Sequence, residues 1–542
     1  MNYIGVDVGT SSARACVVSD TGSILATCVE EITIWNPKSD FYQQSSTNIW
    51  NAVVRSIQRS LAESSVDPKS IKGIGFDATC SLVVLDENFL PLTVSIDGDK
   101  DQNIIMWMDH RAERQVGVIN ATAHPVLDTV GGTMSLEMQM PKLMWLKENL
   151  PDTWAKIGHL MDLPDFLTWK STGSLSRSLC STICKWGYDG GKGWSDDFLS
   201  LINLSDLVID DHLKIGNQVQ RPGTACGSGL LQEVAASLGL PANTPVGTSL
   251  IDAHAGALAC LGCCPSGKTW TSEIENSLVI IAGTSTCHII CSKKGTFVPG
   301  VWGPYHSAIL PEMWVNEGGQ SATGKLMDFI TFTHPSFSTI QELAKEKCVH
   351  PYDFLNQHIQ DMANQTNLPS AAHLTQNVHI WPDFHGNRSP LADPSLKGMV
   401  CGLTLSSSLD DLAILYLAMV QALAYGTKHI VSEMERCGHV ISSIYFCGGL
   451  RSNSLYMKTH SDVLGLPLIL PDTEQSVLLG AAILGAAASG QFESLEEAMF
   501  SMGGQGQIIF PDNSDKRFHE KKYHVFLEML KDQRKYQSLM KE

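Results

Sequence analysis

The sequence predicts an α/β protein made of two domains that share one structural pattern. The chain has 542 residues, which is long enough for at least two domains with separate cores. Hydrophobic residues make up 43% of the chain and charged residues 17%, which is typical of a globular protein. A Gly-Thr-Ser turn between strand-like segments occurs in each half, at Gly9-Thr10-Ser11 and at Gly283-Thr284-Ser285.

The first part of the chain alternates strands and tight turns before its first helix. Alternating apolar residues predict strands at 3–8, 13–18 and 24–29, a helix at 47–62, and further strands at 71–77 and 81–85. The second Gly-Thr-Ser turn is likewise flanked by β-rich segments, at 277–281 and 288–291. A third copy, Gly247-Thr248-Ser249, has a different context and is expected in a loop that enters a helix near 253–261. Because the tripeptide is common, chance remains an alternative explanation for the repeat.

The break between the two domains is expected near residues 262–272. There Cys263-Cys264-Pro265-Ser266-Gly267 interrupts the pattern, so we expect an N-terminal domain of residues 1–265 and a C-terminal domain of residues 266–542. The apolar run 477–489 is too short to span a bilayer and is expected to be a core helix. The charged tail, residues 514–542, is expected to be a surface helix.

Charge and cysteine content limit the partners and the compartment. The formal net charge of −18 argues against binding to nucleic acid or to an anionic membrane, although backbone amides can still hold phosphates. The 15 cysteines include only one CxxC step, at Cys260 to Cys263, so neither a zinc site nor a disulfide framework is expected. Free thiols and the absence of a signal-peptide pattern at the start of the sequence predict a cytoplasmic protein.

The first motif that carries chemistry is Asp7-x-Gly9-Thr10-x-x-x-Arg14. Glycine lets the backbone approach a phosphate, and the amides and the Thr10 hydroxyl can donate to its oxygens. Asp7, at the end of a strand, is placed to hold Mg²⁺, and Arg14 offers positive charge to a transferred phosphoryl group. The alternative is an ordinary hairpin turn with a capping aspartate.

Two further glycine motifs lie in the second half. Gly283-Thr284-Ser285-Thr286 forms a second turn rich in hydrogen-bond donors. Phe446-Cys447-Gly448-Gly449 ends a strand, and a helix is expected to begin at Ser454. Paired glycines allow a flat ring such as adenine to lie against the backbone, with Asn453 available for hydrogen bonds. A plain strand-to-helix turn is the alternative.

The motif that would carry the reaction is Pro245 to Gly256, with Asp252 at its centre. A carboxylate at the start of a helix can accept the proton of an attacking hydroxyl. An isolated aspartate at this position is more often a helix N-cap, and His254 is more often a packed neighbour than a catalyst. A nearby P-loop imitation, Gly319-x-x-x-x-Gly324-Lys325, is rejected because Leu326 replaces the required serine or threonine.

With these motifs in this order, the chain resembles the FGGY family of carbohydrate kinases from about residue 4 to about residue 490. The segments Gly75 to Ser81 and Trp107 to Ala112 are similar to the ribulokinase branch. The resemblance implies two actin-like (ribonuclease H-like) ATPase domains with a nucleotide cleft between them. It also implies ATP and Mg²⁺ as cofactors, and D-ribulose or a related pentulose or pentitol as the substrate.

The family's functional residues fall on specific positions of this chain. Asp252 matches the general base, and Asp7 and Asp252 match metal-associated carboxylates. The positions that match the nucleotide site are Gly9, Thr10, Ser11, Arg14, Gly283, Thr284, Gly324, Gly448, Gly449 and Asn453. The positions that match the sugar site are Ala78, Trp107, Lys185, Asp252 and Glu317.

The residue types also allow ordinary structural roles. Trp107 would fill a core if it were a typical tryptophan, and Lys185 would be surface charge if it were a typical lysine. A second functional hypothesis is an actin-like ATPase, or a nucleotide-gated sugar sensor without phosphoryl transfer. The phosphate turns suit both hypotheses. In contrast, a pure ATPase without a sugar site would have no need for Asp252, Lys185 and Glu317. A homodimer is compatible with the sequence.

Overall fold

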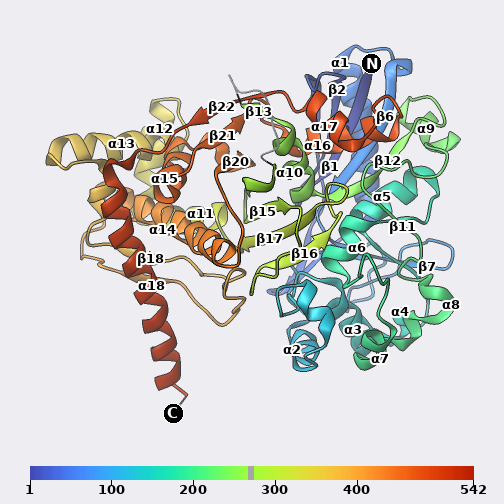
Figure 1. Cartoon of the computed structure of the whole chain (residues 1–542), viewed down its shortest axis with the longest axis horizontal. Helices are drawn as coiled ribbons and strands as arrows, with labels where there is room; N and C mark the ends of the chain where they lie inside the picture. Colours follow the sequence, from blue (N-terminus) through green and yellow to red (C-terminus); the bar gives the residue numbers. More distant parts are fainter. Residues whose placement is uncertain (266–273, 542) are drawn as a thin grey trace.

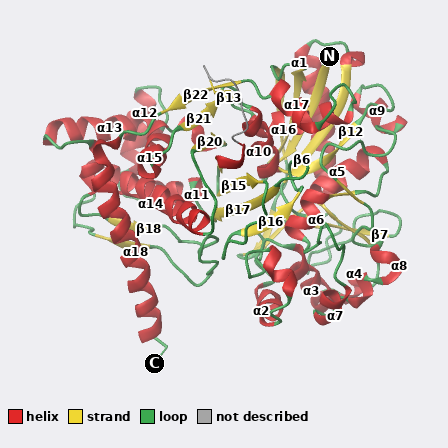
Figure 2. Cartoon of the chain, in the orientation of Figure 1, coloured by secondary structure: helices red, strands yellow, loops and turns green. Residues whose placement is uncertain are grey.

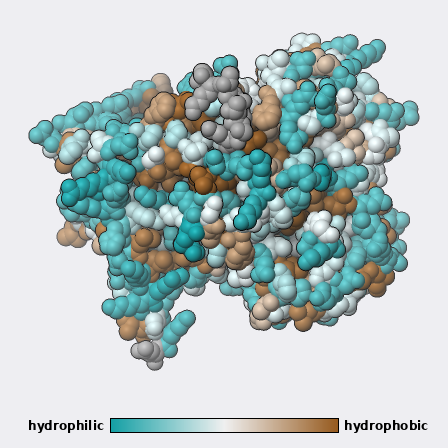
Figure 3. Space-filling view, viewed as in Figure 1, coloured by the Kyte–Doolittle hydropathy of each residue, from teal (hydrophilic) through white to brown (hydrophobic). Residues whose placement is uncertain are grey.

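The computed structural model describes residues 1–265 and 274–541. Two lobes lie side by side in Figure 1: the N-terminus belongs to one, and the C-terminal helix α18 (Lys516–Leu539) extends from the other. In each lobe helices surround a central sheet (Figure 2). Hydrophilic side chains cover most of the face seen in Figure 3, and apolar ones show mainly towards its middle, where the lobes meet.

The sheet of the first lobe begins with two antiparallel hairpins and continues with parallel strands. Its strands are β1 (Asn2–Val8), β2 (Ser12–Ser19), β3 (Ile24–Glu31), β6 (Ile71–Ala78) and β12 (Val246–Ile251). Their order is β12-β6-β1-β2-β3. β1 pairs antiparallel with β2 and β2 with β3, whereas β6 runs parallel to both β1 and β12.

The sheet of the second lobe repeats this arrangement. Its strands are β13 (Cys264–Pro265), β14 (Ser277–Ala282), β15 (Thr286–Ser292), β16 (Trp302–His306), β17 (Trp314–Gln320), β20 (Ser443–Cys447), β21 (Leu468–Pro471) and β22 (Gln505–Ile509). β14 pairs antiparallel with β15 and β15 with β17, while β20 runs parallel to both β14 and β21. The strands β14, β15, β17, β20 and β21 therefore correspond to β1, β2, β3, β6 and β12. The two Gly-Thr-Ser turns occupy equivalent places, after β1 and after β14.

Two helices connect the lobes, because each of them packs on the sheet of the other lobe. α10 (Asp252–Gly262) follows β12 of the first sheet but packs on β14 and β20 of the second. α16 (Ser476–Ala488) comes from the second half but lies on β1, β6 and β12, as Figure 1 shows. Glycines in the first sheet make this contact possible. A Cβ on Gly75 would lie 1.9 Å from the Ala481 carbonyl oxygen, so only glycine lets α16 approach so closely.

A third sheet and several helices complete the first lobe. The strands of this sheet are β4 (Trp35–Lys38), β5 (Phe41–Gln44), β7 (Leu82–Asp86), β8 (Ile104–Ile105) and β9 (Ile157–Asp162). The main helices of the lobe are α1 (Ser46–Ser64), α3 (Gln139–Asn149), α5 (Leu163–Thr172) and α6 (Leu179–Lys185). α6 ends at Lys185, a predicted site residue.

The second lobe is mainly helical around its sheet. Its larger helices are α11 (Gly324–Phe332), α12 (Phe337–Glu346), α13 (Pro351–Thr366), α14 (Leu409–Arg436) and α15 (Ser454–Leu464). A short ribbon of β18 (His379–Trp381) and β19 (Met399–Cys401) lies beside α18. By length and composition α14 passes as a membrane-crossing helix, but 67% of its apolar window is buried in the fold, as in a core helix.

The predicted elements agree with the structure to within about two residues, with one exception. The third Gly-Thr-Ser copy lies inside strand β12 and not in a loop, because Val246 and Gly247 pair with the neighbouring β6. The run predicted as a core helix is α16, and the predicted tail helix is α18, whose last predicted residue, Glu542, lies outside the described residues. The predicted domain boundary adjoins residues 266–273, which also lie outside them, and it stays a prediction.

Candidate active site

Each glycine turn is closed by a hydrogen bond from its glycine amide, to the carbonyl three residues on in the first turn and two residues on in the second. The Gly9 amide donates to the Ser12 carbonyl at 3.0 Å, and the Gly283 amide donates to the Ser285 carbonyl at 2.8 Å. Each turn therefore closes on itself through one hydrogen bond and leaves the following residues at the edge of its sheet. Both turns line one cavity of about 280 Å³, to which residues of both lobes contribute.

Asp252 lies where β12 passes into α10. It is the first residue of the helix, and Ile251 occupies the N-cap position, so Asp252 is not the N-cap. Its Oδ1 accepts a hydrogen bond from the Ala253 amide at 2.7 Å. Burial, followed by the charge of the nearby Asp7, raises the pKa of Asp252 to about 6. A carboxylate with this pKa is ionised at neutral pH and still basic enough to accept a proton.

Asp252, which is half-buried, lies near two buried carboxylates at the ends of parallel strands. Asp7 and Asp77 are direct neighbours on β1 and β6, and both are at most 1% exposed. Arg14 forms an ion pair with Asp7, and this carboxylate is the main cause of the raised pKa of Arg14. Burial and the nearby Asp7 raise the pKa of Asp77 well above its usual value. Apart from the contact between these two carboxyl groups, Asp77 Oδ1 and Oδ2 and Asp7 Oδ1 have no hydrogen-bond partner among the described residues.

A buried set of charged side chains faces this group across the cavity. Lys185 Nζ and the Arg388 guanidinium lie 4.1 and 4.0 Å from the centre of the Trp302 ring. Arg388 also forms an ion pair with Glu317. All three charged residues are at most 9% exposed.

The charges in this set stabilise one another. Burial alone would raise the pKa of Glu317, but Lys185, Arg388 and His254 lower it well below its usual value. Burial alone would lower the pKa of Lys185, but neighbouring groups that include Cys80 and Glu317 raise it. Glu317 is therefore an anion and Lys185 a cation at neutral pH.

Trp107 connects the first glycine turn with the rest of the cavity lining. Its Nε1–H donates to Oγ1 of Thr10 at 3.2 Å, and its backbone amide donates to Oγ of Ser81 at 3.3 Å. The side chain is partly exposed and lines the cavity. Trp107 is therefore not a plain core residue.

Most of the predicted residues meet in this cavity. Those that line it are Asp7, Gly9, Thr10, Arg14, Trp107, Lys185, Asp252, Gly283, Thr284, Glu317, Gly448 and Gly449. A larger hollow of about 580 Å³ lies nearby, lined by aromatic residues such as Tyr188 and Trp314, and it contains none of the predicted residues. The charged groups gather in the smaller cavity, which is therefore the candidate active site.

Four predicted residues do not line the cavity. Gly324 supports the second turn from behind, since its amide donates to the Gly283 carbonyl at 3.0 Å. Asn453 caps α15, and its amide group donates to the Tyr416 hydroxyl at 2.7 Å. Ala78 is fully buried at the end of β6, and Ser11 lies at the exposed tip of the first turn. Their proposed ligand contacts stay predictions.

Sequence reasoning missed several lining residues, of which Arg388 is the most prominent. Arg388 lies in an irregular segment between β18 and β19, and no spacing or motif connects it with Glu317. Glu137 and Cys287 also line the cavity and lie near the Arg388 guanidinium. Asp77 does not line the cavity, but its position beside Asp7 could have been predicted, because the ends of two adjacent parallel strands bring their side chains together.

Comparisons with known proteins agree with this geometry. Residues 2–259 match the N-terminal domain of the FGGY family of carbohydrate kinases, and residues 278–489 match its C-terminal domain. The chain belongs to this family. It is a sugar kinase, that is, a phosphotransferase with a carbohydrate acceptor.

Individual relatives extend the match to nearly the whole chain. An FGGY carbohydrate kinase domain-containing protein of Xenopus laevis is 51% identical over 99% of this chain and 98% of its own length. A D-ribulokinase of Saccharomyces cerevisiae is 40% identical over 91% of this chain and 73% of its own length. The crystal structure of a xylulose kinase from Rhodospirillum rubrum superposes with a TM-score of 0.78 at 19% identity, over 99% of each chain. The predicted fold class, two actin-like α/β domains around a cleft, is confirmed.

Proposed function

We propose that this FGGY kinase transfers the γ-phosphate of ATP to the terminal hydroxyl of D-ribulose, with Asp252 as the general base. The observation that carries the proposal is the meeting in one cavity of two glycine turns, a carboxylate with a pKa of about 6, and the buried, oppositely charged Lys185 and Glu317. The 40% identity with a yeast D-ribulokinase supports the choice of sugar.

The reaction follows from the arrangement of the cavity. The β- and γ-phosphates of ATP would lie between the Gly9-Thr10 and Gly283-Thr284 turns, with the adenosine against Gly448 and Gly449. Lys185 and Glu317 would hold hydroxyls of the sugar, with the Trp107 ring beside them. Asp252 accepts the proton of the terminal hydroxyl as its oxygen forms a bond to the γ-phosphorus. The bond from the γ-phosphorus to the bridging oxygen breaks, and ADP leaves.

The carboxylates beside the first turn suit a hard cation. Asp7 Oδ1 is buried and has no hydrogen-bond partner other than the Asp77 carboxyl group among the described residues, and carboxylate oxygens are the ligands that Mg²⁺ prefers. We assign Asp7 and Asp252 as the residues that would hold Mg²⁺. When bound, the ion would neutralise charge on the phosphate oxygens.

The decisive test combines a panel of sugars with one substitution. ATP turnover is measured with D-ribulose, L-ribulose, D-xylulose and ribitol, for the wild type and for Asp252→Asn. We expect saturable turnover with D-ribulose, reduced at least roughly a hundredfold in Asp252→Asn, with sugar binding largely retained. Sugar-independent ATP hydrolysis would contradict the proposal, and full activity of Asp252→Asn would contradict the role of this residue.

A further inference from the structure

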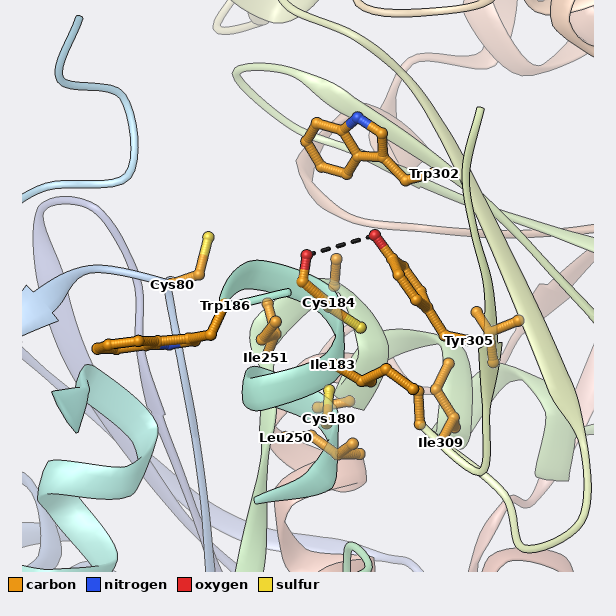
Figure 4. Close-up of a cluster of buried hydrophobic side chains, with 14 of the residues drawn as sticks. Cys80, Cys180, Ile183, Cys184, Trp186, Leu250, Ile251, Trp302, Tyr305 and Ile309 are labelled. Atoms are coloured by element: carbon orange, nitrogen blue, oxygen red, sulfur yellow. Dashed lines mark hydrogen bonds between the residues drawn. The ribbon is translucent and has the colours of Figure 1, made fainter. Parts of the chain in front are cut away.

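A cluster of potential metal ligands lies directly behind the sugar side of the cavity. The sulfur atoms of Cys180 and Cys184 and a ring nitrogen of His254 all lie within 4.8 Å of one another, and all three residues are buried. None of them is needed for the proposed transfer. Figure 4 shows the two cysteines on α6 among apolar side chains such as Ile183 and Leu250.

The positions of α6 and α10 bring the three side chains close together. Cys180 and Cys184 are four residues apart on α6, so both thiols face the same side of the helix. His254 comes from the first turn of α10, two residues after Asp252. The Tyr305 hydroxyl donates to the Cys184 carbonyl at 3.3 Å, which fixes the end of α6 from the other lobe (Figure 4).

The histidine has the orientation that metal-bound histidines commonly have. Its Nδ1 lies 2.9 Å from Sγ of Cys180, so this nitrogen points into the cluster. Its Nε2 lies 3.0 Å from Oε2 of Glu317, so the opposite side of the ring contacts a carboxylate. In protein metal sites a carboxylate on the outer nitrogen fixes the ring and increases the basicity of the inner nitrogen.

We propose that Cys180, Cys184 and His254 bind one thiophilic metal ion, Zn²⁺ or Cu⁺. Thiolate sulfur and imidazole nitrogen are ligands that both ions accept, and an apolar surround excludes competing water. Three protein ligands suit Cu⁺, which tolerates low coordination numbers, whereas Zn²⁺ needs a fourth ligand. Two thiol protons are released on binding, and the sulfurs form bonds to the ion without any change of oxidation state.

The ion would join the two helices that carry the proposed sugar residues. α6 ends with Lys185, directly after Cys184, and α10 begins with Asp252, two residues before His254. A bound ion would therefore fix Lys185 relative to Asp252 and hold Glu317 through the outer nitrogen of His254. This consequence rests on the proposed function, whereas the site itself does not.

Metal content is the direct test, because it does not depend on any activity. The protein is produced with added zinc or copper salt, so that the ion is present as the chain folds. It is then purified with a phosphine reductant, without oxygen for the copper arm, and the metal per chain is measured by mass spectrometry. We expect about one ion per chain, and the arm with the higher occupancy identifies the ion. Occupancy below about a tenth in both arms would overturn the proposal.

Three variants locate the ion. Cys184→Ala removes a ligand, whereas Cys16→Ala removes an equally buried thiol on β2 and is the matched control. We expect Cys184→Ala to bind the ion at least tenfold more weakly and Cys16→Ala to bind it as the wild type does, in competition with a coloured chelator. Glu317→Gln should weaken binding roughly 10- to 100-fold through His254. Equal metal content in Cys184→Ala and Cys16→Ala would place the ion elsewhere and overturn the site.

Discussion

Arg388 offers the sharpest test of the proposed sugar side of the cavity. Its guanidinium forms an ion pair with Glu317, lies 4.0 Å from the centre of the Trp302 ring and is 3.8 Å from a carboxylate oxygen of Glu137. Arg388→Met keeps an unbranched apolar side chain over the ring but removes the charge. Glu317 then retains Lys185 and His254 as partners, which should keep the chain folded.

The expected magnitude follows from the interaction that is lost. A hydrogen bond to a charged group contributes about 1.5–3 kcal/mol, and about 1.4 kcal/mol corresponds to a tenfold change in affinity. Arg388→Met should therefore weaken binding of the sugar substrate roughly 10- to 150-fold. ATP affinity should change less than about twofold, because the ion pair lies on the sugar side and not at the phosphate turns.

Calorimetric titration of both ligands measures this effect. The control is Arg436→Met, which removes an arginine that is exposed and pairs with Glu433 on the same helix. We expect the control to bind both ligands as the wild type does, and circular dichroism checks that both variants are folded. A folded Arg388→Met variant with unchanged sugar affinity would refute the view that Arg388 organises Glu317 for the sugar.

Three further predictions concern the base, the interlobe packing and the phosphate turn. Because an acid with a pKa of about 6 is protonated below that pH, kcat/KM should fall about tenfold per pH unit below pH 6, and the residual activity of Asp252→Asn should lack this step. Gly75→Ala should lower the free energy of unfolding by about 1–3 kcal/mol in denaturant titrations, whereas Gly117→Ala, with nothing within 4 Å of its new Cβ, should not destabilise the chain. Trp107→Phe removes the hydrogen bond to Thr10 and should raise the KM for ATP roughly two- to tenfold; an unchanged KM would show that this bond does not position the turn.

The repeated fold was predictable because its signals are local. Each Gly-Thr-Ser turn joins two strands that are adjacent in the sequence, so alternating apolar residues and a turn suffice to predict the hairpin. The corresponding turns then lie at corresponding edges of two similar sheets. This geometry explains why Thr10 and Thr284, which are far apart in the sequence, line the same cavity.

The missed features depend on contacts between distant segments. The third Gly-Thr-Ser copy, at 247–249, lies in a strand because residues on both sides of Thr248 and Ser249 pair with β6, which the tripeptide itself does not reveal. Arg388 reaches Glu317 from an irregular segment that carries no periodic signal. The Asn453 side chain caps α15, and its ligand contact stays a prediction. The cluster of Cys180, Cys184 and His254 was not predicted, because its two cysteines do not have CxxC spacing and its histidine is far away in the sequence.

The crossed packing of α10 and α16 bears on how the two lobes can move. α16 lies directly on the first sheet through glycine contacts, so it moves with that sheet, whereas α10 packs both on α16 and on β14 and β20 of the second sheet. Asp252 lies at the junction where β12 of the first sheet becomes α10, next to Asp7 of the same sheet. A rotation of the second lobe would therefore carry Gly283 and Gly448 towards the first turn while Asp252 and Asp7 keep their relative positions. We expect lobe closure to change the distance between the two phosphate turns and to leave the base and the carboxylates of the first sheet in place.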